Sequence, residues 1–476
     1  MFELAATRHS KLSTLGGFNH VHLAEPQKMT VSTKEPCKLE IFSMDLGLDR
    51  IKSLLYALGS PEKNLSVIHV AGTNGKGSVC AYIASILKAA GFKVGRYNSP
   101  HFLEPTDAMQ ICDESIDSAA YRELCDRVAS VDKENNCGAS TFELSTAAAI
   151  LWFYESKVDF AVIEVGLGGT LDATNVFDNV VASVITPIGM DHAGILGNSI
   201  AEIASAKAGI IKANCPVIAS PQPEADAMDV VKKTAQRLSS PLLISPMARW
   251  CSPSKEQATV DIRYPNDRPL TTYQFKIPLY GDHQLVNAAT AVSTIHILKN
   301  AKNDLDIKIT VEHIQQGMAD TRWPGRLDLL TKEQCPWLTN LYSIDEMFVD
   351  GAHNPPAAQV LREFVDQQCQ TRNNDKVQWI IASTEGKDVK ELLSILLRPQ
   401  DSVCATTFTQ PENMPWISHM DPSEIRDIAA TVASGPCTVE PSLAQALRNA
   451  GQSKGLIVLC GSLYLVADLY RLHRHI

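Results

Sequence analysis

The sequence has few of the features that mark specialised protein classes. No apolar run approaches the roughly 20 residues that a helix needs to cross a bilayer. The 12 cysteines include no Cys-x-x-Cys pair and have no histidine at metal-ligand spacing, so neither a disulfide framework nor a zinc site is supported. No internal repeat or low-complexity tract occurs. With 43 Lys and Arg against 53 Asp and Glu, the charge of -10 argues against general affinity for nucleic acid or an anionic membrane surface.

What remains is the composition of an ordinary globular protein. The chain has 476 residues, of which 45% are hydrophobic and 20% charged, which is enough for two or three domains with full cores. Residues 1–40 are polar and mixed, without the apolar segment of a secretory signal. Glu3 and Glu25 argue against a transit peptide there. We expect a flexible N-terminal extension on a cytoplasmic monomer, and a mitochondrial form stays open.

The most informative stretch is Gly-Thr-Asn-Gly-Lys-Gly-Ser at residues 72–78. Glycines allow successive backbone N–H groups to point at phosphate oxygens, Lys76 adds a positive charge, and the Ser78 hydroxyl can reach Mg²⁺. An apolar strand is expected at 65–70 and an alanine-rich helix at 78–90, whose N-terminus favours anions. The alternative, a glycine-rich turn with a chance lysine, is disfavoured by this strand and helix. The sequence therefore predicts a phosphate-binding loop.

Apolar periodicity predicts alternating helices and strands around this loop. A helix is expected at 46–58, ending at Gly59. Further strands are expected at 158–165, 180–186 and 216–219, and further helices at 140–153, 199–211, 225–238, 287–298 and 311–318. Two alternating segments within 258–277 predict a β-hairpin around Tyr264, Pro265, Asn266 and Asp267. This alternation is typical of a mostly parallel sheet covered by helices on both faces.

The pattern breaks at Trp323-Pro324-Gly325-Arg326, where proline and glycine are adjacent. It then restarts, with strands expected at 347–349, 377–382, 401–406 and 456–459 and helices at 355–367, 388–397 and 463–472. We therefore expect a phosphate-binding α/β domain over 41–325 and a smaller α/β domain over 326–476.

Polar and glycine-rich stretches follow several predicted strands, at the edge where open α/β sheets bind ligands. They begin at Tyr97, Ile163, Thr186 and Phe348 and contain Ser99, Glu164, His192 and His353. A carboxylate in an apolar strand, such as Glu164, costs free energy unless it is paired or binds a cation. Mg²⁺ fits beside a phosphate loop because it prefers oxygen ligands. Taken alone, Glu164 could equally pair with a lysine, and each stretch could be a structural turn.

With these stretches in order, the chain resembles the folylpolyglutamate synthase and dihydrofolate synthase family of the Mur ligase superfamily. The resemblance runs from about Leu46 to His473. Within the family, residues 383–388, 397–399, 414–417 and 460–465 are similar to the fungal dihydrofolate synthases. The resemblance implies a Mur-ligase-like P-loop ATPase domain with a parallel-rich sheet and a Rossmann-like C-terminal α/β domain, the glutamate ligase domain.

The resemblance also implies roles for individual residues. Those expected to bind ATP are Thr73, Asn74, Gly75, Lys76, Gly77, Ser78, Asn287, Arg326 and Asp350. Those expected around Mg²⁺ are Ser99, Glu164 and His192, and those expected on the substrate are Ser140 and Asp172. Catalytic roles fall to Lys76, Lys207 and His353. Lys207 matches a lysine that can be carbamylated in this family, although unmodified it could equally be an ion-pair residue.

The implied reaction is ATP-dependent joining of L-glutamate to 7,8-dihydropteroate through an acyl phosphate, with ATP and Mg²⁺ as cofactors. Three alternatives stay open: a folylpolyglutamate synthase, a paralogous ligase acting on another carboxylic acid in specialised metabolism, and a nucleotide-binding regulator without catalysis. The last is disfavoured because the expected catalytic and metal residues are all present. Two departures from the family bear on the substrate, since Thr170 stands where arginine is common and Phe102 where leucine is common.

Overall fold

The computed structural model describes residues 46–192, 194–252, 255–264, 269–300, 308–411, 414 and 417–474. These belong to one compact unit, Leu46–Ile476. Three of the sequence predictions fall at least partly outside the described residues. They are the extension over 1–40, the hairpin residues Pro265, Asn266 and Asp267, and Pro415 and Trp416 of the 414–417 stretch. Within the described ranges, no helix has both the length and the apolar character needed to span a membrane.

The first sheet has eight strands in the order β4-β3-β2-β5-β1-β6-β7-β8. They are β1 (Val67–Ala71), β2 (Val94–Tyr97), β3 (Met109–Ile111), β4 (Glu114–Ser115), β5 (Phe160–Glu164), β6 (Val180–Ile185), β7 (Val217–Ala219) and β8 (Leu242–Ile244). The neighbouring strands in the series β2-β5-β1-β6-β7-β8 are parallel to one another. Strands β3 and β4 add an antiparallel edge beside β2. The loops that follow β1, β2, β5 and β6 therefore lie at one edge, where such sheets bind ligands.

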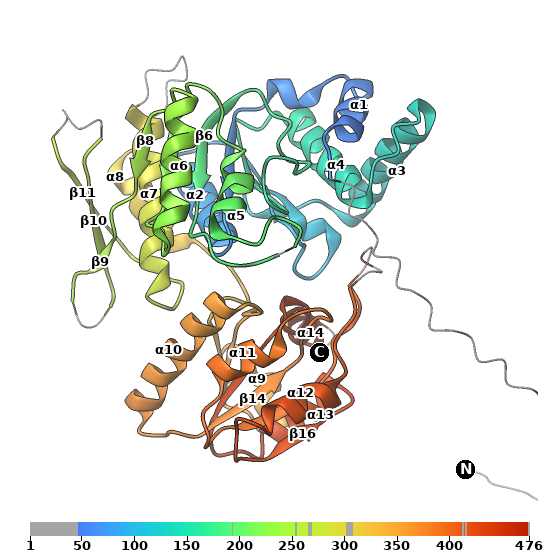
Figure 1. Cartoon of the computed structure of the whole chain (residues 1–476), viewed down its shortest axis with the longest axis vertical. Coiled ribbons are helices and arrows are strands. Elements are labelled where there is room, and N and C mark those ends of the chain that lie inside the picture. Colours follow the sequence, from blue (N-terminus) through green and yellow to red (C-terminus); the bar gives the residue numbers. More distant parts are fainter. Residues whose placement is uncertain are drawn as a thin grey trace, which may run out of the picture. The chain divides into compact units, whose positions relative to one another are not determined.

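Helices and a small second sheet cover both faces of this sheet (Figure 1). One face packs against α2 (Lys76–Ala89), α7 (His283–Asn300), α8 (Val311–Asp320) and an antiparallel sheet of β9 (Arg249–Trp250), β10 (Ala258–Ile262) and β11 (Thr271–Phe275). Elsewhere the sheet packs against α1 (Asp49–Ala57), α3 (Ser118–Asn135), α4 (Thr141–Glu155), α5 (Ile200–Ala208) and α6 (Ala225–Arg237), with short 3-10 helices at Pro61–Asn64 and Pro105–Ala108. Strand alternation explains the two cores, because Ile68 and Val70 face α2 whereas Val67 faces α4.

The other large sheet has six strands in the order β12-β13-β17-β14-β15-β16. They are β12 (Asp328–Thr331), β13 (Glu346–Val349), β14 (Val377–Ile381), β15 (Ser402–Ala405), β16 (Cys437–Val439) and β17 (Leu456–Cys460), and only β12 is antiparallel to its neighbour. One face packs against α10 (Pro355–Arg372), α11 (Val389–Leu396) and α12 (Pro422–Ala429). The other packs against α9 (Pro336–Tyr342), α13 (Leu443–Ala450) and α14 (Leu463–Arg474).

These two parallel-rich sheets confirm the expected fold class. Along the chain, the eight-stranded sheet ends with β8 before the Pro-Gly break, and the six-stranded sheet begins with β12 after it. The domain division at residue 325 stays a prediction.

Several helix boundaries were wrong. Helix α7 begins at His283 rather than at residue 287, and α10 ends at Arg372 rather than at residue 367. Helix α2 begins at Lys76 rather than at Ser78, because Gly75, with a φ of 85°, ends the loop there. Helix α3 was not predicted, since only Leu124 and Val128 of its residues are buried and the apolar stripe is weak.

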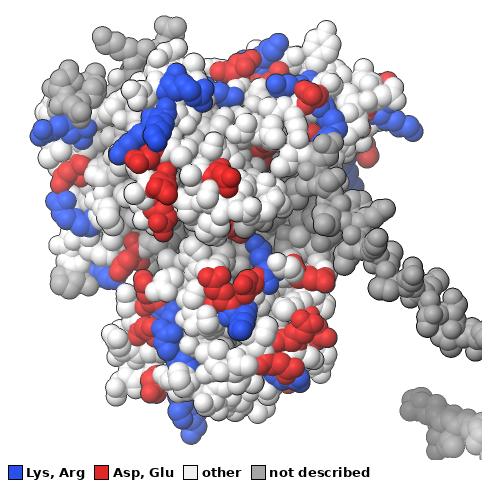
Figure 2. All heavy atoms as spheres, viewed as in Figure 1, with Lys and Arg blue, Asp and Glu red and all other residues white. Residues whose placement is uncertain are grey.

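Charged side chains of both signs are interspersed over the face drawn in Figure 2. The chain carries a formal charge of -10, so its average field repels anionic ligands. Attraction for phosphate groups must therefore come from a local arrangement of lysines and backbone N–H groups.

Candidate active site

The phosphate loop between β1 and α2 is held by the segment that follows β6. The N–H groups of Thr73 and Asn74 donate to the Pro187 carbonyl at 3.0 and 3.3 Å. The Thr73 hydroxyl donates to the Gly189 carbonyl and accepts from the Gly189 N–H, each at 3.1 Å. The loop is therefore fixed above the first turn of α2, where helical N–H groups without intrahelical partners favour anions.

Two side chains cover this loop so closely that glycine is required beneath them. A Cβ at Gly75 would lie 2.3 Å from Oδ1 of Asn287, and a Cβ at Gly77 would lie 2.4 Å from Cζ2 of Trp323. Asn287 is buried on α7. The structure thus places Asn287 against the phosphate loop, and it adds Trp323, which sequence reasoning had treated only as part of a break.

Lys76 lies between the phosphate loop and a buried carboxylate. Its Nζ donates to the Thr73 carbonyl at 3.2 Å and is 3.8 Å from Oε1 of Glu164. Glu164 ends β5, and its Oε2 accepts a hydrogen bond from Nδ2 of Asn98 at 2.7 Å. Burial raises the pKa of Glu164, while Lys76, Asn98 and two arginines favour the carboxylate. The site therefore holds a carboxylate whose charge is only partly matched.

The residues expected around Mg²⁺ have donors that suit such an ion. Ser99 follows β2, and its buried Oγ has no hydrogen-bond partner within the described part of the chain. An unsatisfied buried hydroxyl, here one residue from the Asn98 that contacts Glu164, needs an explanation such as a bound ion. Among the described residues, no group of three or more His, Cys, Asp and Glu side chains is arranged to hold a metal. The expected set has only Glu164 and His192 of those types, which fits Mg²⁺ because it commonly takes its other ligands from water and substrate phosphates.

His192 is a neutral imidazole at this edge. Its side chain is 42% exposed, and partial loss of hydration lowers its pKa; the adjacent Asp191 opposes this, and three lysines, Lys76 among them, reinforce it. Its Nε2 lies 3.8 Å from Oδ2 of Asp191, beyond hydrogen-bond distance. Neutral imidazole is the form that binds metals, so His192 is in the state that its expected role requires.

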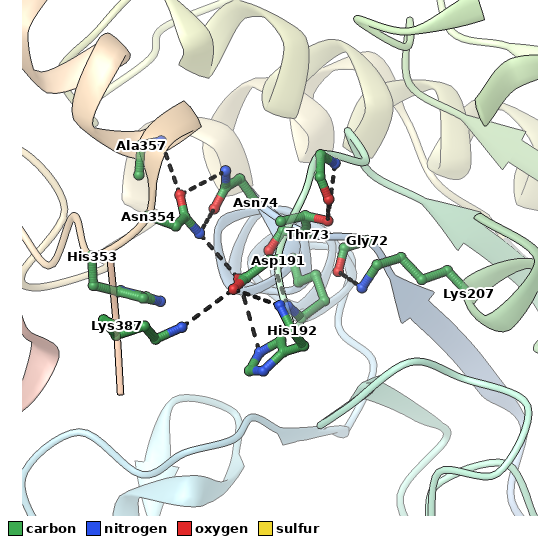
Figure 3. A network of polar contacts seen from close by, with 12 residues as sticks. Gly72, Thr73, Asn74, Asp191, His192, Lys207, His353, Asn354, Ala357 and Lys387 are labelled. Atoms are coloured by element: carbon green, nitrogen blue, oxygen red, sulfur yellow. Dashed lines mark hydrogen bonds and ion pairs between the residues drawn. The ribbon is translucent and has the colours of Figure 1, made fainter. Parts of the chain in front are cut away.

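Asp191 joins loops that follow both large sheets (Figure 3). Its Oδ1 accepts from Nζ of Lys387 at 3.2 Å, and its Oδ2 accepts from Nδ2 of Asn354 at 3.2 Å. Asn354 Nδ2 also donates to Oδ1 of Asn74, in the phosphate loop, at 3.3 Å. Burial raises the pKa of Asp191, but His192, which is protonated in the acidic range where Asp191 titrates, and Lys387 outweigh it and hold the pKa at about 2. Asp191 is therefore an anion at neutral pH, with Lys387 as its cation.

Lys207 reaches the same loop from α5. Its Nζ donates to the Gly72 carbonyl at 2.8 Å, and burial together with the charge of Lys76 lowers its pKa to about 7, against the opposing charges of Asp191 and Asp172. A sizeable share of its amines is therefore neutral near pH 7. Thr170, one of the departures from the family, donates through its N–H and hydroxyl to the Ala206 carbonyl at 2.8 and 3.0 Å.

Asp350 shapes the turn after β13. Its Oδ2 accepts from the Leu327 N–H at 2.8 Å and its Oδ1 from the Ala352 N–H at 2.7 Å. Burial raises the pKa of Asp350, and the charge of Arg326 opposes that shift. A Cβ at Gly351 would lie 3.0 Å from Nη1 of Arg326, so the guanidinium lies against this turn.

The turn presents His353 in a defined tautomer. Its Nδ1 donates to the Gly351 carbonyl at 2.7 Å, because a carbonyl can only accept. Burial is the main cause that lowers the pKa of His353, to about 4. The ring is therefore neutral at pH 7, with Nε2 as its acceptor nitrogen.

Ser140 and Asp172, expected on the substrate, have structural contacts of their own. Ser140 is exposed and caps α4, accepting from the Glu143 N–H at 3.3 Å while the Glu143 carboxylate accepts from the Ser140 N–H at 2.7 Å. Asp172 is buried, with Oδ2 accepting from the Leu167 N–H at 2.7 Å and Oδ1 from the Thr174 N–H at 3.0 Å. Burial raises the pKa of Asp172.

The ring of Phe142 lies near Asp172. A Cβ at Gly166 would be 2.6 Å from Cζ of Phe142 and 3.2 Å from Oδ2 of Asp172, so these two groups and the glycine backbone surround one point. Sequence reasoning missed Phe142, although it lies in the segment that begins at Ser140.

Several other residues of the site were also missed. Asn98, Asp191 and Lys387 lie in stretches that the sequence had singled out, directly beside Ser99, His192 and Asp388, so their polar character was an available signal. Arg96 carried no such signal, because it lies outside the stretches that the sequence had singled out, on the strand β2 that was not predicted.

Comparison with known proteins agrees with this geometry. Residues 70–295 match the Mur ligase middle domain, and residues 342–472 match the dihydrofolate synthetase C-terminal domain. The probable dihydrofolate synthetase of Schizosaccharomyces pombe is 38% identical, and the dihydrofolate synthetase of Saccharomyces cerevisiae 34%, each over 90% of this chain and 98% of the relative.

Solved structures show the same fold. E. coli FolC in complex with DHPP and ADP has a TM-score of 0.72 at 26% identity, over 92% of this chain and 95% of that one. A bifunctional folylpolyglutamate synthase/dihydrofolate synthase with Mn, AMPPNP and L-glutamate bound has a TM-score of 0.74 at 26% identity, over 92% and 97%. From the sequence likeness over nearly the whole chain, the matched domains and the shared fold, the chain belongs to the dihydrofolate synthetase and folylpolyglutamate synthase family of Mur ligases.

Proposed function

We propose that the protein is a dihydrofolate synthase, which joins L-glutamate to 7,8-dihydropteroate at the expense of ATP. The observation that carries the proposal is the convergence of Lys76, Glu164 and Asp191 at one sheet edge, in a chain similar to two yeast dihydrofolate synthetases over 98% of their length. In the first step a carboxylate oxygen of the substrate bonds to the γ-phosphorus and ADP leaves. The amine nitrogen of glutamate then bonds to the acyl carbon, phosphate leaves and one proton is released.

The chain's contribution to the first step is positioning and charge. The first turn of α2 offers its N–H groups to the phosphates, and Lys76 Nζ is near enough to Thr73 and Glu164 to stay fixed while it meets the γ-phosphate. We assign Asn287, Arg326 and Asp350 to the remainder of the nucleotide, supported by the contact of Asn287 with Gly75 and by the position of Arg326 at the Asp350 turn.

We assign Ser99, Glu164 and His192 to a divalent cation. The unsatisfied Ser99 hydroxyl, the partly matched Glu164 carboxylate and the neutral His192 ring support this assignment. When bound, Mg²⁺ would neutralise charge that develops on the transferred phosphoryl group.

Lys207 is proposed to carry a carbamate. Its neutral amine, favoured by the lowered pKa of about 7, would bond through nitrogen to the carbon of carbon dioxide and release a proton. The product is an anion beside Lys76 and would turn Lys207 from a competing cation into a partner of the metal site. Mass spectrometry would test it, because the carbamate adds the mass of carbon dioxide at Lys207 in the native protein.

The second step needs the glutamate amine to be held as it loses a proton. His353 Nε2 is an acceptor on the segment that also carries Asn354. With a pKa of about 4, His353 is a weak base, so we assign it to orienting the amine rather than to removing its proton. For the pteridine, we propose Asp172, in the loop after β5, as the acceptor for ring N–H groups and Phe142, on α4, as the apolar neighbour, with Ser140 at the N-cap of α4.

Three broader features complete the proposal. A division at residue 325 is supported by the position of the Pro-Gly break between β8 and β12. A monomer is carried over from the sequence as part of the proposal. The cytoplasm is supported by Glu3 and Glu25, which are unfavourable in a transit peptide.

The decisive experiment compares substrates. We expect the purified protein to glutamylate 7,8-dihydropteroate with ATP and L-glutamate, and to extend folate monoglutamates poorly, since a site shaped for the shorter acid rejects an added glutamate by clash or unpaired charge. Efficient addition of several glutamates to tetrahydrofolate would instead support a folylpolyglutamate synthase. Inactivity on every pterin, with turnover of ATP on another acid, would support a paralogous ligase.

A further inference from the structure

Arg96 is a buried guanidinium beside the proposed site. It lies on β2, two residues before Asn98, and is 6% exposed. Its Nη1 donates to Oδ1 of Asn98 at 3.3 Å and its Nη2 donates to Oε1 of Gln110. The nearest carboxylate, that of Asp113, is 3.9 Å away, so its short contacts go to amide oxygens rather than to a charge.

The contact with Asn98 determines how that amide is turned. A guanidinium has only donors, so Asn98 must direct Oδ1 toward Arg96. Nδ2 of Asn98 is then left to donate to Oε2 of Glu164, where it lies at 2.7 Å. If the amide turned over, its oxygen would face the carboxylate and repel it. Arg96 therefore fixes the hydrogen bond that holds Glu164 with its other oxygen toward Lys76.

The flat face of the same guanidinium reaches the phosphate loop. Cζ of Arg96 lies 4.8 Å from the centre of the Trp323 ring, a cation–π contact. The same ring also lies close to Gly77, since a Cβ there would lie 2.4 Å from Cζ2 of Trp323. One side chain thus touches the residue that orients the carboxylate and the residue that covers the loop.

Stability alone gives a poor reason for this arrangement. A buried guanidinium loses its hydration, and the ion pair at 3.9 Å with a half-exposed carboxylate returns little of that free energy. Its Nε has no hydrogen-bond partner among the described residues. An apolar side chain would fill the same space more favourably, so the charge is best explained by what it orients.

We propose that Arg96 is a positioning residue that couples the two halves of the proposed site, acting on Glu164 through Asn98 and on the phosphate loop through Trp323. The proposal rests on the proposed function for the ligands themselves, a nucleotide with its divalent cation. Arg96 touches neither of them. Its replacement should weaken magnesium-dependent nucleotide binding in a protein that is still folded.

The test is calorimetric binding of ADP over a series of Mg²⁺ concentrations, with no pterin or glutamate present. We expect Arg96→Met to weaken binding about tenfold or more at low Mg²⁺, with much of the loss recovered at high Mg²⁺. Arg96→Lys keeps the positive charge but cannot contact Asn98 and Trp323 together. Its affinity for ADP should lie between those of Arg96→Met and the parent. Trp323→Leu leaves Asn98 and Glu164 in place, so it should weaken ADP binding by a similar factor at every Mg²⁺ concentration.

The matched control is the other buried arginine over a tryptophan. Arg362 lies 5.6 Å from the centre of the Trp379 ring and pairs with Asp401, within the six-stranded sheet. Arg362→Lys should lower the melting temperature and leave ADP binding unchanged. If Arg96→Met does not fold, Arg96→Lys and Trp323→Leu carry the test.

The outcomes separate the two proposals. If the parent does not bind ADP, or Glu164→Gln leaves its magnesium dependence unchanged, the proposed site is wrong. If the parent and Glu164→Gln behave as expected but folded Arg96→Lys binds ADP within twofold of the parent throughout the Mg²⁺ series, the positioning role is wrong and the site stands.

Discussion

Glu164 and Asp401 are both buried carboxylates beside a strand, and both have an arginine stacked on a tryptophan nearby, yet their surroundings differ. Oδ2 of Asp401 accepts from Nη1 of Arg362 at 3.1 Å, from Nε1 of Trp379 at 3.0 Å and from the Arg398 N–H at 3.0 Å. Glu164 has one hydrogen bond at 2.7 Å, and its nearest lysine is 3.8 Å away.

The difference separates a structural carboxylate from one that is available to a ligand. Burial raises the pKa of both groups, so each needs favourable partners to stay ionised. Asp401 has its cation in direct contact through Oδ2, although its buried Oδ1 has no hydrogen-bond partner among the described residues. At Glu164 the side chain of Asn98 lies between the Arg96 guanidinium and the carboxylate, and it binds only Oε2. Oε1 of Glu164 is left facing Lys76 and the phosphate loop. A cation supplied with a nucleotide can complete that environment.

The largest effects should come from removing the cation beside each carboxylate, which is Lys76 for Glu164 and Arg362 for Asp401. Lys76→Ala should lower ligation by more than about a hundredfold, because it removes positive charge at the transferred phosphoryl group. Its melting temperature should stay within a few degrees of the parent. Arg362→Met should do the opposite, losing roughly 3–5 kcal/mol of stability by leaving Asp401 without its partner while activity per folded molecule is retained.

Rates with saturating substrates and thermal melts of the same samples check both variants. Lys232→Ala, at an exposed position on α6, is the control for loss of a lysine. Turnover within a few-fold of the parent in Lys76→Ala would contradict the phosphate-loop assignment.

Next in size is the magnesium requirement. Glu164→Gln keeps the shape of the side chain and should raise the Mg²⁺ concentration needed for half-maximal activity by roughly 10–100-fold, with a much smaller change in the requirement for glutamate. His192→Ala should act in the same direction. Asp401→Asn should lower stability and leave the magnesium requirement as in the parent. Equal magnesium curves for Glu164→Gln and Asp401→Asn would remove the distinction between the two carboxylates.

The pH dependence of Lys207 gives a further contrast. In the unfolded chain its pKa is near 10.4, whereas in the folded protein it is about 7, so between these values the unfolded state binds more protons. Stability therefore rises with pH in this window, at about 1.4 kcal/mol per pH unit. Relative to Lys207→Met, the nucleotide-free parent should gain roughly 3 kcal/mol between about pH 7 and about pH 9.5.

Denaturant unfolding at each pH measures this difference, and carbon dioxide should be excluded to keep the amine unmodified. Lys232→Met is the control at an exposed position and should follow the parent curve. A constant offset between the parent and Lys207→Met would show that the amine is not perturbed.

The sequence could predict the parts of this comparison that depend on local pattern. Apolar runs located β1, β5 and β6, and a glycine-rich loop with one lysine located α2 to within two residues of its start, so the fold class and Lys76 followed from short segments. The helix expected from residue 140 is confirmed as α4, and its capping box from Ser140 to Glu143 explains the contacts of Ser140 without a substrate.

Contacts between distant segments could not be predicted in this way. Asn354 meets Asn74 across 280 positions, and Lys387 meets Asp191 across 196. No periodicity encodes which loops meet, because packing of whole elements decides it. Arg96 is the clearest case, since the charge that would argue against a buried strand is held there by Asn98, Gln110 and Trp323.

The smallest effect should come from Phe102, the second departure from the family. Its ring meets that of Tyr470 at 5.3 Å, edge to face, and packs beside Gly325, so it ties the segment after Ser99 to α14. Phe102→Leu should therefore cost about 1 kcal/mol of stability. Because the contacts of Phe102 are with Tyr470 and the Gly325 turn rather than with Lys76 or Glu164, the Michaelis constant for the pterin should change by a few-fold while the magnesium requirement does not. Steady-state kinetics over both concentrations measure this, with Tyr470→Leu as the matched variant from the other side of the contact. A large change in the magnesium requirement of either variant would mean that α14 acts on the Glu164 carboxylate. The contact between Phe102 and Tyr470 would then belong to the ligand-binding region rather than to a structural one.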